Sequence, residues 1–398
     1  MRLHLPPGPL SGEIDLPISK SIANRYLILD ALAGQEFSLA DNLPEDVEIL
    51  RSALNSDSSE ISVGMAGTAI RFLTAFYAIQ DGKTVILTGA DRMKQRPIGI
   101  LVDTLNELGA KIEYLEEDGF PPLKIKGNKL SGGEVNVSAS VSSQFVSALM
   151  MIGPMMKNGL RINLEGKVLS RPYIELTADC MRKCGAEIQF DGSVISIESS
   201  SYKIPELNIE SDWSAASYFY ALAAARPNSK LLLKGLKLDS TQGDSILADW
   251  FTEIGVTSVQ KEKGVQIQSG SEIRLPQKVD FTSNPDLAQT FAFLAVTLGQ
   301  TLKLTGLDNL RLKETNRVEA LKTEIKKLGG SVLIDGNSLS ISGSVSTKEA
   351  YINTYNDHRM AMSSAVLSTV IPTEIENSDV VVKSFPDFWS GVVGLTPV

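Results

Sequence analysis

Histidine and cysteine are scarce in this sequence. The 398 residues include two histidines and two cysteines. Cys180 and Cys184 lie four residues apart in a predicted helix, so they share one face, and this spacing suits packing better than a disulfide. With only His4 and His358 to add, no cluster of cysteine and histidine ligands can be completed. The sequence therefore predicts no metal site and two packed, unbridged thiols.

Positive charge and long apolar runs are also limited. Lys and Arg number 38 against 47 Asp and Glu, which gives a net charge of −9 and a pI near 5.0. An acidic chain without basic blocks argues against a nucleic-acid or anionic-membrane partner. The longest apolar run, ALMMIGPMM, is too short to span a bilayer, and MRLHLPPGPLSG lacks the apolar core of a signal peptide. We expect a cytoplasmic protein that binds small molecules, with no nucleic-acid or membrane partner.

The bulk composition is that of a globular protein of more than one domain. Hydrophobic residues make up 43% of the chain and charged residues 21%, which is ordinary for folded proteins. A single hydrophobic core stops growing at roughly 250–300 residues. The length therefore favours two domains, each large enough for its own core.

A long internal repeat organises the sequence. Each copy has an apolar helix, a glycine turn, a strand and a second helix, followed by alternating residues such as KIEYLEE that indicate strands. The second helices end at Leu108-Gly109-Ala110, Cys184-Gly185-Ala186, Ile254-Gly255-Val256 and Leu328-Gly329-Gly330, a period of about 70–76 residues. Each glycine fits a left-handed helix C-cap. Degenerate copies begin at Ser21 and at His358, so we expect six copies in two domains of three.

The first helix of each copy is apolar nearly all round, which predicts that it is buried. Polar residues gather at or just before the N-terminal ends of these helices: Lys20, Ser21, Arg25, Thr68, Arg71, Ser142, Ser143, Gln144, Asp286, His358 and Arg359. Helix N-termini present unpaired N–H groups and a partial positive charge, so such residues there favour binding of phosphate or carboxylate. Any one serine, taken alone, is better explained by N-capping than by contact with a ligand.

Ten motifs occur in one order from about Leu16 to Phe388: KSIANR, AGTAIR, RMKQRPIG, SSQF, SRPY, SAASYF, NPDLAQT, LKETNR, YNDHRMAM and KSFPD. In order and spacing the sequence resembles the 5-enolpyruvylshikimate-3-phosphate synthases. The resemblance implies an α+β fold, α/β within each repeat unit, whose two domains each contain three βαβαββ repeats. It also implies domains at residues 1–18 with 211–398 and at 19–210, with the active site in the cleft between them.

The resemblance further implies the reaction and its residues. Enzymes of this family transfer the enolpyruvyl group of phosphoenolpyruvate to the 5-hydroxyl of shikimate 3-phosphate and release phosphate, without a metal or cofactor. The implied catalytic residues are Asp286, Glu314, Lys20 and His358. Residues implied to bind phosphoenolpyruvate are Lys20, Gly67, Thr68, Arg96, Gln144, Arg317, Arg359 and Lys383. Those implied to bind shikimate 3-phosphate are Ser21, Arg25, Ser142, Ser143, Gln144, Ser170, Tyr173, Asn309 and Lys313. A monomer is expected.

The sequence departs from the family pattern in three places. Met65 precedes Ala66-Gly67-Thr68 where an asparagine is usual, and Asn316 replaces the aspartate of KETDR. The stretch RSALNSDSSEISVGMAGT is shorter than usual, so we expect a truncated first repeat whose missing strands lie at a domain edge. Two alternatives remain: a UDP-N-acetylglucosamine enolpyruvyl transferase, whose reactive loop cysteine has no counterpart in GADRMKQRPIG, and a catalytically inactive ligand-binding homologue.

Overall fold

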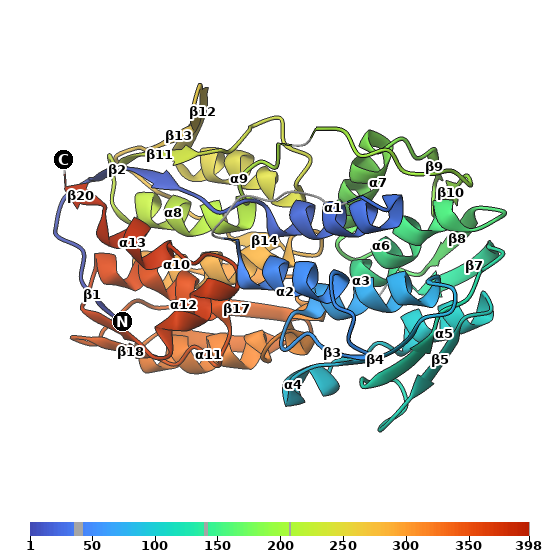
Figure 1. Ribbon diagram of the computed structural model, residues 1–398. Coiled ribbons are helices and arrows are strands. Elements are labelled where there is room, and N and C mark those ends of the chain that lie inside the picture. The colour runs from blue at the N-terminus through green and yellow to red at the C-terminus, as the bar shows by residue number, and fades with distance from the viewer. Residues whose placement is uncertain (36–42, 139–141, 207, 398) are drawn as a thin grey trace. The chain divides into compact units, whose positions relative to one another are not determined.

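The computed structural model describes residues 1–35, 43–138, 142–206 and 208–397. These residues form two compact units: Met1–Ser19 with Glu210–Val398, called unit 1, and Lys20–Ile209, called unit 2. Unit 1 contains both ends of the chain, marked N and C in Figure 1. The predicted boundaries, after residues 18 and 210, differ from these by one residue.

Four modules share one plan of strand, helix, strand, helix and antiparallel strand pair. In each module the first two strands are parallel, and the fourth strand lies between the second and the third. The first module of unit 2 contains β3 (Glu60–Ser62), α3 (Gly67–Ala78), β4 (Thr84–Thr88), α4 (Asp91–Lys94), α5 (Gly99–Glu107), β5 (Lys111–Tyr114) and β6 (Leu123–Lys126). The second contains β7 (Gly133–Ser138), α6 (Ser143–Ile152), η1 (Gly153–Met155), β8 (Leu160–Glu165), α7 (Arg171–Lys183), β9 (Ile188–Asp191) and β10 (Val194–Ile197).

Unit 1 contains the other two modules. One is built from β14 (Lys278–Asp280), η3 (Pro285–Leu287), α10 (Ala288–Leu298), β15 (Leu302–Thr305), η4 (Asp308–Leu312), α11 (Arg317–Lys327), β16 (Ser331–Asp335) and β17 (Ser338–Ser342). The other is built from β2 (Leu10–Asp15), α8 (Trp213–Ala225), β11 (Lys230–Lys234), η2 (Gly243–Ile246), α9 (Leu247–Ile254), β12 (Val256–Lys261) and β13 (Gly264–Ser269). Unit 2 is inserted in this last module, because β2 pairs in parallel with β11 although 214 residues separate the ends of the two strands.

The copies at the two ends of the repeat series are incomplete. The C-terminal copy has β18 (Ala350–Ile352), α12 (His358–Ser364), η5 (Ala365–Thr369) and β19 (Thr373–Ile375), then η6 (Ser378–Lys383) and α13 (Phe388–Val393). Its third strand is β1 (Arg2–Leu3), and β20 (Thr396–Pro397) pairs with β2 instead. The copy at Ser21 has α1 (Lys20–Ala33) and α2 (Glu45–Leu54), and its predicted strand near Phe37 lies outside the described residues. Among the described residues, four modules are complete and the copies at Ser21 and His358 are partial, in keeping with their degenerate sequences.

The first helices of the copies are buried, as their all-round apolar sequences predicted. In α8 every residue from Trp213 to Ala224 is buried, and α10 and α12 are buried over nearly their whole length. Helix α10 packs against both α8 and α12, as the ribbon of unit 1 shows (Figure 1). In unit 2, α6 packs between α3 and α7. The N-terminal ends of these helices are therefore the places where polar side chains reach the edge of a dry core.

The glycines that end the second helices adopt the predicted left-handed conformation. Their φ angles are +96° at Gly109, +88° at Gly185, +109° at Gly255 and +96° at Gly329. A left-handed residue turns the chain from helix into strand, and glycine does so without a Cβ clash. Glycine therefore recurs at this position of each module because the backbone there must adopt a left-handed conformation.

Replacing Gly329 by alanine should destabilise unit 1 by about 2–3 kcal/mol. The strained φ contributes about 1–2 kcal/mol, and the new Cβ would lie 3.0 Å from Cβ of Ser346 and closer still to its hydroxyl, which adds an overpacking penalty. All three tryptophans, Trp213, Trp250 and Trp389, belong to unit 1. Denaturant unfolding followed by tryptophan fluorescence therefore reports on this unit.

The matched control for that prediction is Gly336→Ala in the β16–β17 turn. Gly336 also has a positive φ, of +53°, but its Cβ position is open, with nothing within 4 Å. This variant should lose only the conformational part, about 1 kcal/mol. Equal losses for the two variants would contradict the predicted clash at Ser346.

The two chain segments that leave and re-enter unit 1 are tied together within it. Ile18 and Ser211 form an antiparallel bridge, and the Ser19 N–H donates to the Glu210 carbonyl at 2.8 Å. The buried Gln242 side chain accepts from the Ser19 hydroxyl and donates to the Ser211 carbonyl, both at 2.8 Å. One amide therefore fixes both segments to the start of η2.

Both cysteines are free and buried, as predicted. They lie on one face of α7, and burial raises the pKa of the Cys180 thiol to about 11, so it remains protonated at neutral pH. Across the described residues, no three or more His, Cys, Asp or Glu side chains gather in a metal-binding arrangement. Over the same ranges, no helix has the length and apolar character needed to cross a membrane.

Candidate functional site

A buried arginine joins two helix starts in unit 1. Arg317 begins α11 and is 1% exposed. Its Nε lies 2.7 Å and its Nη2 3.2 Å from the two carboxylate oxygens of Asp357. Asp357 in turn caps α12 by accepting the Arg359 N–H at 2.9 Å. Asp357 therefore orients the Arg317 side chain through a bidentate ion pair and accepts a hydrogen bond from the backbone of Arg359.

Asn316 keeps a structural role despite replacing the family's aspartate. Its side-chain oxygen accepts the Glu319 N–H at 3.3 Å, which caps α11. Asparagine and aspartate are about equally good N-caps. The substitution thus leaves the helix that presents Arg317 intact.

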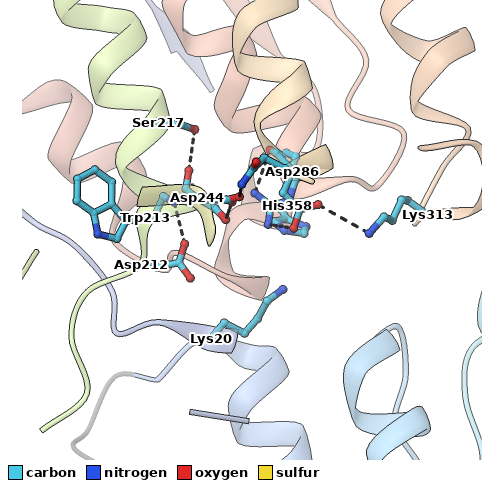
Figure 2. Close-up of polar contacts among 12 residues, drawn as sticks. Lys20, Asp212, Trp213, Ser217, Asp244, Asp286, Lys313 and His358 are labelled. Atoms are coloured by element: carbon cyan, nitrogen blue, oxygen red, sulfur yellow. Dashed lines mark hydrogen bonds and ion pairs between the residues drawn. The ribbon is translucent and has the colours of Figure 1, made fainter. Parts of the chain in front are cut away.

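Asp286 is surrounded by three cations of unit 1. Its carboxylate lies 2.7 Å from Arg359 Nη2, 3.3 Å from Arg317 Nη1 and 3.8 Å from Lys313 Nζ. Figure 2 shows Lys313 reaching toward Asp286. Asp286 belongs to η3, whose Pro285 starts the turn after Asn284. Nearby positive charges favour the ionised carboxylate, which is the form that accepts a proton.

Glu314 has its own pair of cations in the same cluster. Its two carboxylate oxygens lie 3.0 Å from Arg317 Nη2 and 3.1 Å from Lys383 Nζ. Lys383 ends η6 and is 5% exposed. Ion pairs thus link four cations and three acids, Asp286, Glu314 and Asp357, into one cluster. An acid and a base with different neighbours can divide two proton transfers.

The charge of the central arginine is fixed by its surroundings. Burial alone would lower the pKa of Arg317, but the carboxylates of Asp357, Glu314 and Asp286 outweigh it and raise that pKa well above its ordinary value. Arg317 is therefore a permanent cation at the centre of the cluster. A permanent buried cation can hold an anionic ligand group without changing protonation.

His358 lies next to this cluster, at the first position of α12. It is 1% exposed, and its Nδ1 lies 4.0 Å from an oxygen of Asp357. Figure 2 shows His358 beside Asp286. Asn309 lies in η4, four residues before Lys313.

In unit 2, Arg96 lies against the start of α3. The guanidinium is 6% exposed, and its Nε and Nη1 have no hydrogen-bond partner among the described residues. A Cβ added to Gly67 would lie 2.5 Å from Arg96 Nη1, so the two positions are in direct contact. Arg71 holds the same turn by donating to the Gly67 carbonyl at 2.7 Å. A buried cation without a partner is unfavourable unless an anion binds to it.

The serine and glutamine motifs of unit 2 meet the same helix. Gln144 Nε2 donates to Thr68 Oγ1 at 3.0 Å, which joins α6 to α3. Ser142 caps α6, accepting the Gln144 N–H at 3.3 Å, and the next residue, Ser143, is buried. Ser170, also buried, stands before α7 in a left-handed conformation with φ +55°. In the shortened first repeat, the three-residue strand β3 lies at the edge of its sheet. Thr68 still contacts Gln144, another residue implied to bind phosphoenolpyruvate.

Arg25 is buried among neutral acceptors. Its guanidinium donates to the Ser21 and Tyr173 carbonyls at 2.7 and 3.0 Å and to Thr177 Oγ1 at 2.7 Å. Burial lowers its pKa to about 10, and nearby Cys180 and Tyr173 partly offset that shift. These hydrogen bonds hold the three predicted acceptor-site residues Ser21, Arg25 and Tyr173 together, and none of the three acceptors is a carboxylate.

Lys20 pairs with an acid that sequence reasoning missed. Its Nζ lies 2.8 Å from Asp46 Oδ2, and Asp46 is 4% exposed in the first turn of α2. In the sequence, PEDVEIL is typical of any helix start, where acids complement the dipole. Asp46 differs from an ordinary acid at a helix start because it is buried and paired with Lys20.

The family is decided by comparison with known sequences. The sequence profile described as EPSP synthase (3-phosphoshikimate 1-carboxyvinyltransferase) matches residues 46–391. The chain belongs to the EPSP synthase family. A 3-phosphoshikimate 1-carboxyvinyltransferase of Bacteroides fragilis (strain YCH46) is 44% identical over 393 residues, covering 96% of this chain and 95% of the relative. One from Colwellia psychrerythraea is 35% identical and covers 96% of each chain.

Solved EPSP synthases have the same fold. The structure of EPSP synthase from Acinetobacter baumannii matches with a TM-score of 0.77 at 20% identity, covering 99% of this chain and 98% of that one. The predicted α/β architecture and the predicted family are confirmed. The chain is thus an enolpyruvyl transferase of the 3-phosphoshikimate type, and the residues that serve this EPSP synthase remain predictions.

Gly67→Ala should weaken phosphoenolpyruvate binding about 10- to 100-fold while leaving shikimate 3-phosphate affinity within about twofold. The methyl group would displace the Arg96 guanidinium, and misplacement by about 1 Å can cost 10²-fold. Calorimetric titration of phosphoenolpyruvate in the presence of shikimate 3-phosphate, with steady-state KM values, measures the change. Gly99→Ala is the control, because Gly99 also begins a helix, α5, but the nearest non-neighbour atom to its added Cβ would lie at 3.3 Å. Unchanged phosphoenolpyruvate binding in Gly67→Ala would refute the role of this contact.

Proposed function

We propose that the chain transfers the enolpyruvyl group of phosphoenolpyruvate to the 5-hydroxyl of shikimate 3-phosphate and releases phosphate. One observation carries the proposal: Asp286 and Glu314 are held at ion-pair distance by four cations of unit 1. Two phosphates and two carboxylates must be bound together in this reaction. Their mutual repulsion is overcome only where many cations are gathered in advance.

The two carboxylates divide the proton transfers. Asp286 accepts the proton of the attacking 5-hydroxyl, and Glu314, which is paired with Lys383, gives a proton to the methylene carbon of phosphoenolpyruvate, which becomes a methyl group. This addition forms a tetrahedral intermediate, and loss of a proton from that methyl group together with phosphate restores the double bond. A general acid or base must lie within hydrogen-bond distance of the atom that gains or loses the proton, and its neighbours must set its protonation state. The different cation partners of Asp286 and Glu314 support this division.

The donor is held by cations from both units. Arg317, Arg359 and Lys383 in unit 1 and Arg96 in unit 2 each bind phosphoenolpyruvate. The buried, unpartnered guanidinium of Arg96 supports this role in unit 2. If one donor molecule contacts both units, Arg96→Met and Lys383→Met should each weaken phosphoenolpyruvate binding, although the two residues belong to different units.

The acceptor is held chiefly by unit 2. The start of α6, with Ser142, Ser143 and Gln144, and Ser170 before α7 bind the shikimate phosphate through hydroxyl groups and helix N–H groups. Lys313 of unit 1 contributes a charge to it. Arg25, with Ser21 and Tyr173 beside it, binds the shikimate carboxylate, for which its neutral partners leave the cation uncompensated.

Two other readings are less well supported. A UDP-N-acetylglucosamine enolpyruvyl transferase of this fold needs a cysteine in the loop that here reads GADRMKQRPIG, whereas both cysteines are buried in or next to α7. The curated relatives are 3-phosphoshikimate enzymes. An inactive homologue has no chemical need for two paired acids and a full set of cations. We propose a monomeric cytoplasmic enzyme that uses no cofactor and no nucleic-acid partner.

Phosphate release by the purified protein tests the proposal. Release should require both phosphoenolpyruvate and shikimate 3-phosphate, and UDP-N-acetylglucosamine should not replace the acceptor. Calorimetry run in parallel reports binding of each substrate by the same sample. Binding of shikimate 3-phosphate without phosphate release would instead support the inactive homologue.

A further inference from the structure

A fourth buried acid, Asp244, lies near Asp286. Asp244 belongs to η2 and is 3% exposed. It is not one of the residues implied by the family resemblance, and nothing in the mechanism above uses it. Figure 2 shows Asp244 and Asp286 lying close together in unit 1.

Asp244 is bonded to the turn that carries Asp286. Its Oδ1 accepts a hydrogen bond from Asn284 Nδ2 at 3.1 Å, and Asn284 lies immediately before η3, two residues ahead of Asp286. Its Oδ2 accepts from the Ser214 hydroxyl at 2.5 Å, which anchors it to the first turn of α8. One carboxylate thus fixes the position of the Asp286 turn relative to the buried helix α8.

Asp244 also interacts electrostatically with the groups of the site. Burial, and then the negative charge of Asp286, raise the pKa of Asp244 to about 6, while hydrogen bonds from Ser214 and Asn284 and the charge of Arg359 act in the opposite direction. Arg359 is the cation nearest to Asp286, at 2.7 Å. The two acids and this arginine therefore form one electrostatic group.

We propose that Asp244 is a positioning residue that orients Asp286 through Asn284 and, through its negative charge, strengthens Asp286 as a proton acceptor. This inference rests on the proposed function, in which Asp286 is the base. A second negative charge nearby makes it harder to keep Asp286 ionised and so increases its affinity for a proton. Without Asp244, the cations around Asp286 would make it a weaker base.

The sign of the pH effect follows from the charges that face the pair. Asp286 faces Lys313, Arg317 of α11, Arg359 of α12 and the buried Tyr218 of α8, and Asp244 faces Asp286 and Arg359. Burial raises the pKa of Tyr218 to about 12, so it carries no charge over this pH range. Replacing Asp244 by asparagine removes one negative charge and leaves these three cations. Ionisation of Asp286 then becomes easier, so the acid limb of the rate profile moves to lower pH.

Asp244→Asn separates the charge from the hydrogen bonds. The amide oxygen can still accept from Asn284, and the amide N–H₂ can donate to Ser214, whose hydroxyl can reverse. We expect the acid limb of kcat and of kcat/KM to shift down by about one pH unit and kcat at pH 8 to fall about 3- to 10-fold. Asn284→Ala loses the bond to the turn and one of the two hydrogen bonds that favour the Asp244 carboxylate, so it should lower kcat about tenfold and move the limb to lower pH by less than Asp244→Asn does.

Asp239→Asn, an exposed acid of the same loop, is the matched control and should behave as wild type. The inference is overturned if wild type turns over and Asp244→Asn has the wild-type pH profile. Wild-type protein without acceptor-dependent phosphate release would count against the proposed function itself. Should Asp244→Asn fail to fold, Ser214→Ala is tested instead. It removes a hydrogen bond that favours the ionised Asp244 carboxylate, so the acid limb of the rate profile should again move to lower pH. An acid limb that does not move overturns the proposal.

Discussion

Asp286→Asn should lower kcat by about 10²- to 10⁴-fold, the range expected for loss of a positioned general base. The amide has the size of the carboxylate but cannot accept the hydroxyl proton. It also ends the ion pairs to Arg359 and Arg317 at 2.7 and 3.3 Å, which frees those cations. Affinity for shikimate 3-phosphate should remain within a few-fold, because its proposed contacts lie chiefly in unit 2.

Phosphate release and calorimetry together measure these two expectations. Asp335→Asn, which replaces an exposed acid at the end of β16, controls for the loss of one charge from unit 1 and should be neutral. A variant that retains a tenth or more of the wild-type kcat would remove Asp286 from the role of base. Loss of shikimate 3-phosphate binding in equal measure would point to a positional effect on the whole site.

Arg317→Gln should destabilise unit 1 by about 3–5 kcal/mol, the usual effect of removing one partner of a buried ion pair. Asp357, which is fully buried, would lose both of its guanidinium hydrogen bonds, and Glu314 and Asp286 would each lose one. Catalysis should be lost as well, since the donor clamp loses its central cation. Tryptophan-monitored denaturation of unit 1 measures the stability change.

The pH dependence of this variant has a definite sign. Without Arg317, the pKa values of the buried carboxylates should be higher in the folded state than in the unfolded state. A carboxylate of this kind makes the folded state less stable as the pH rises and the group must ionise. The loss should therefore be greater at pH 8 than at pH 5, where protonation relieves the uncompensated charge. Arg274→Gln, which breaks the exposed pair with Glu272 at 2.7 Å, should leave the stability of unit 1 close to that of the wild type at either pH. A loss in Arg317→Gln as small as that control would contradict the buried-network account.

Much of the fold could be predicted because its signals are local. A helix that is apolar on all sides must be buried, and Gly109 or Gly329 must follow a helix wherever the chain turns through a left-handed residue. The short strands at the chain ends gave no such signal. β1 and β20 are two residues each, too short for an alternating pattern, and their partners β19 and β2 are chosen by tertiary packing alone.

The candidate site was predictable in its residues but not in its pairings. The order of the motifs pointed to Arg317, Asp286 and Glu314, and nothing local indicates that Arg317 pairs with Asp357, 40 residues away. Asp46 and Asp244 were missed for a related reason. A carboxylate at the start of a helix has the same sequence pattern whether it faces solvent or is buried against a cation or another acid.

The insertion of unit 2 between β2 and α8 sets an order of events during synthesis. Strand β2, Leu10–Asp15, is among the first residues made, but its parallel partner β11 ends at Lys234. At about 5–20 residues per second, the ribosome needs roughly 10–40 s to reach it. All of unit 2 is translated in that interval, so it can fold while β2 still has an unpaired edge. Until β11 is made, the N–H and C=O groups along that edge of β2 are without their parallel partner and are open to pairing with another strand.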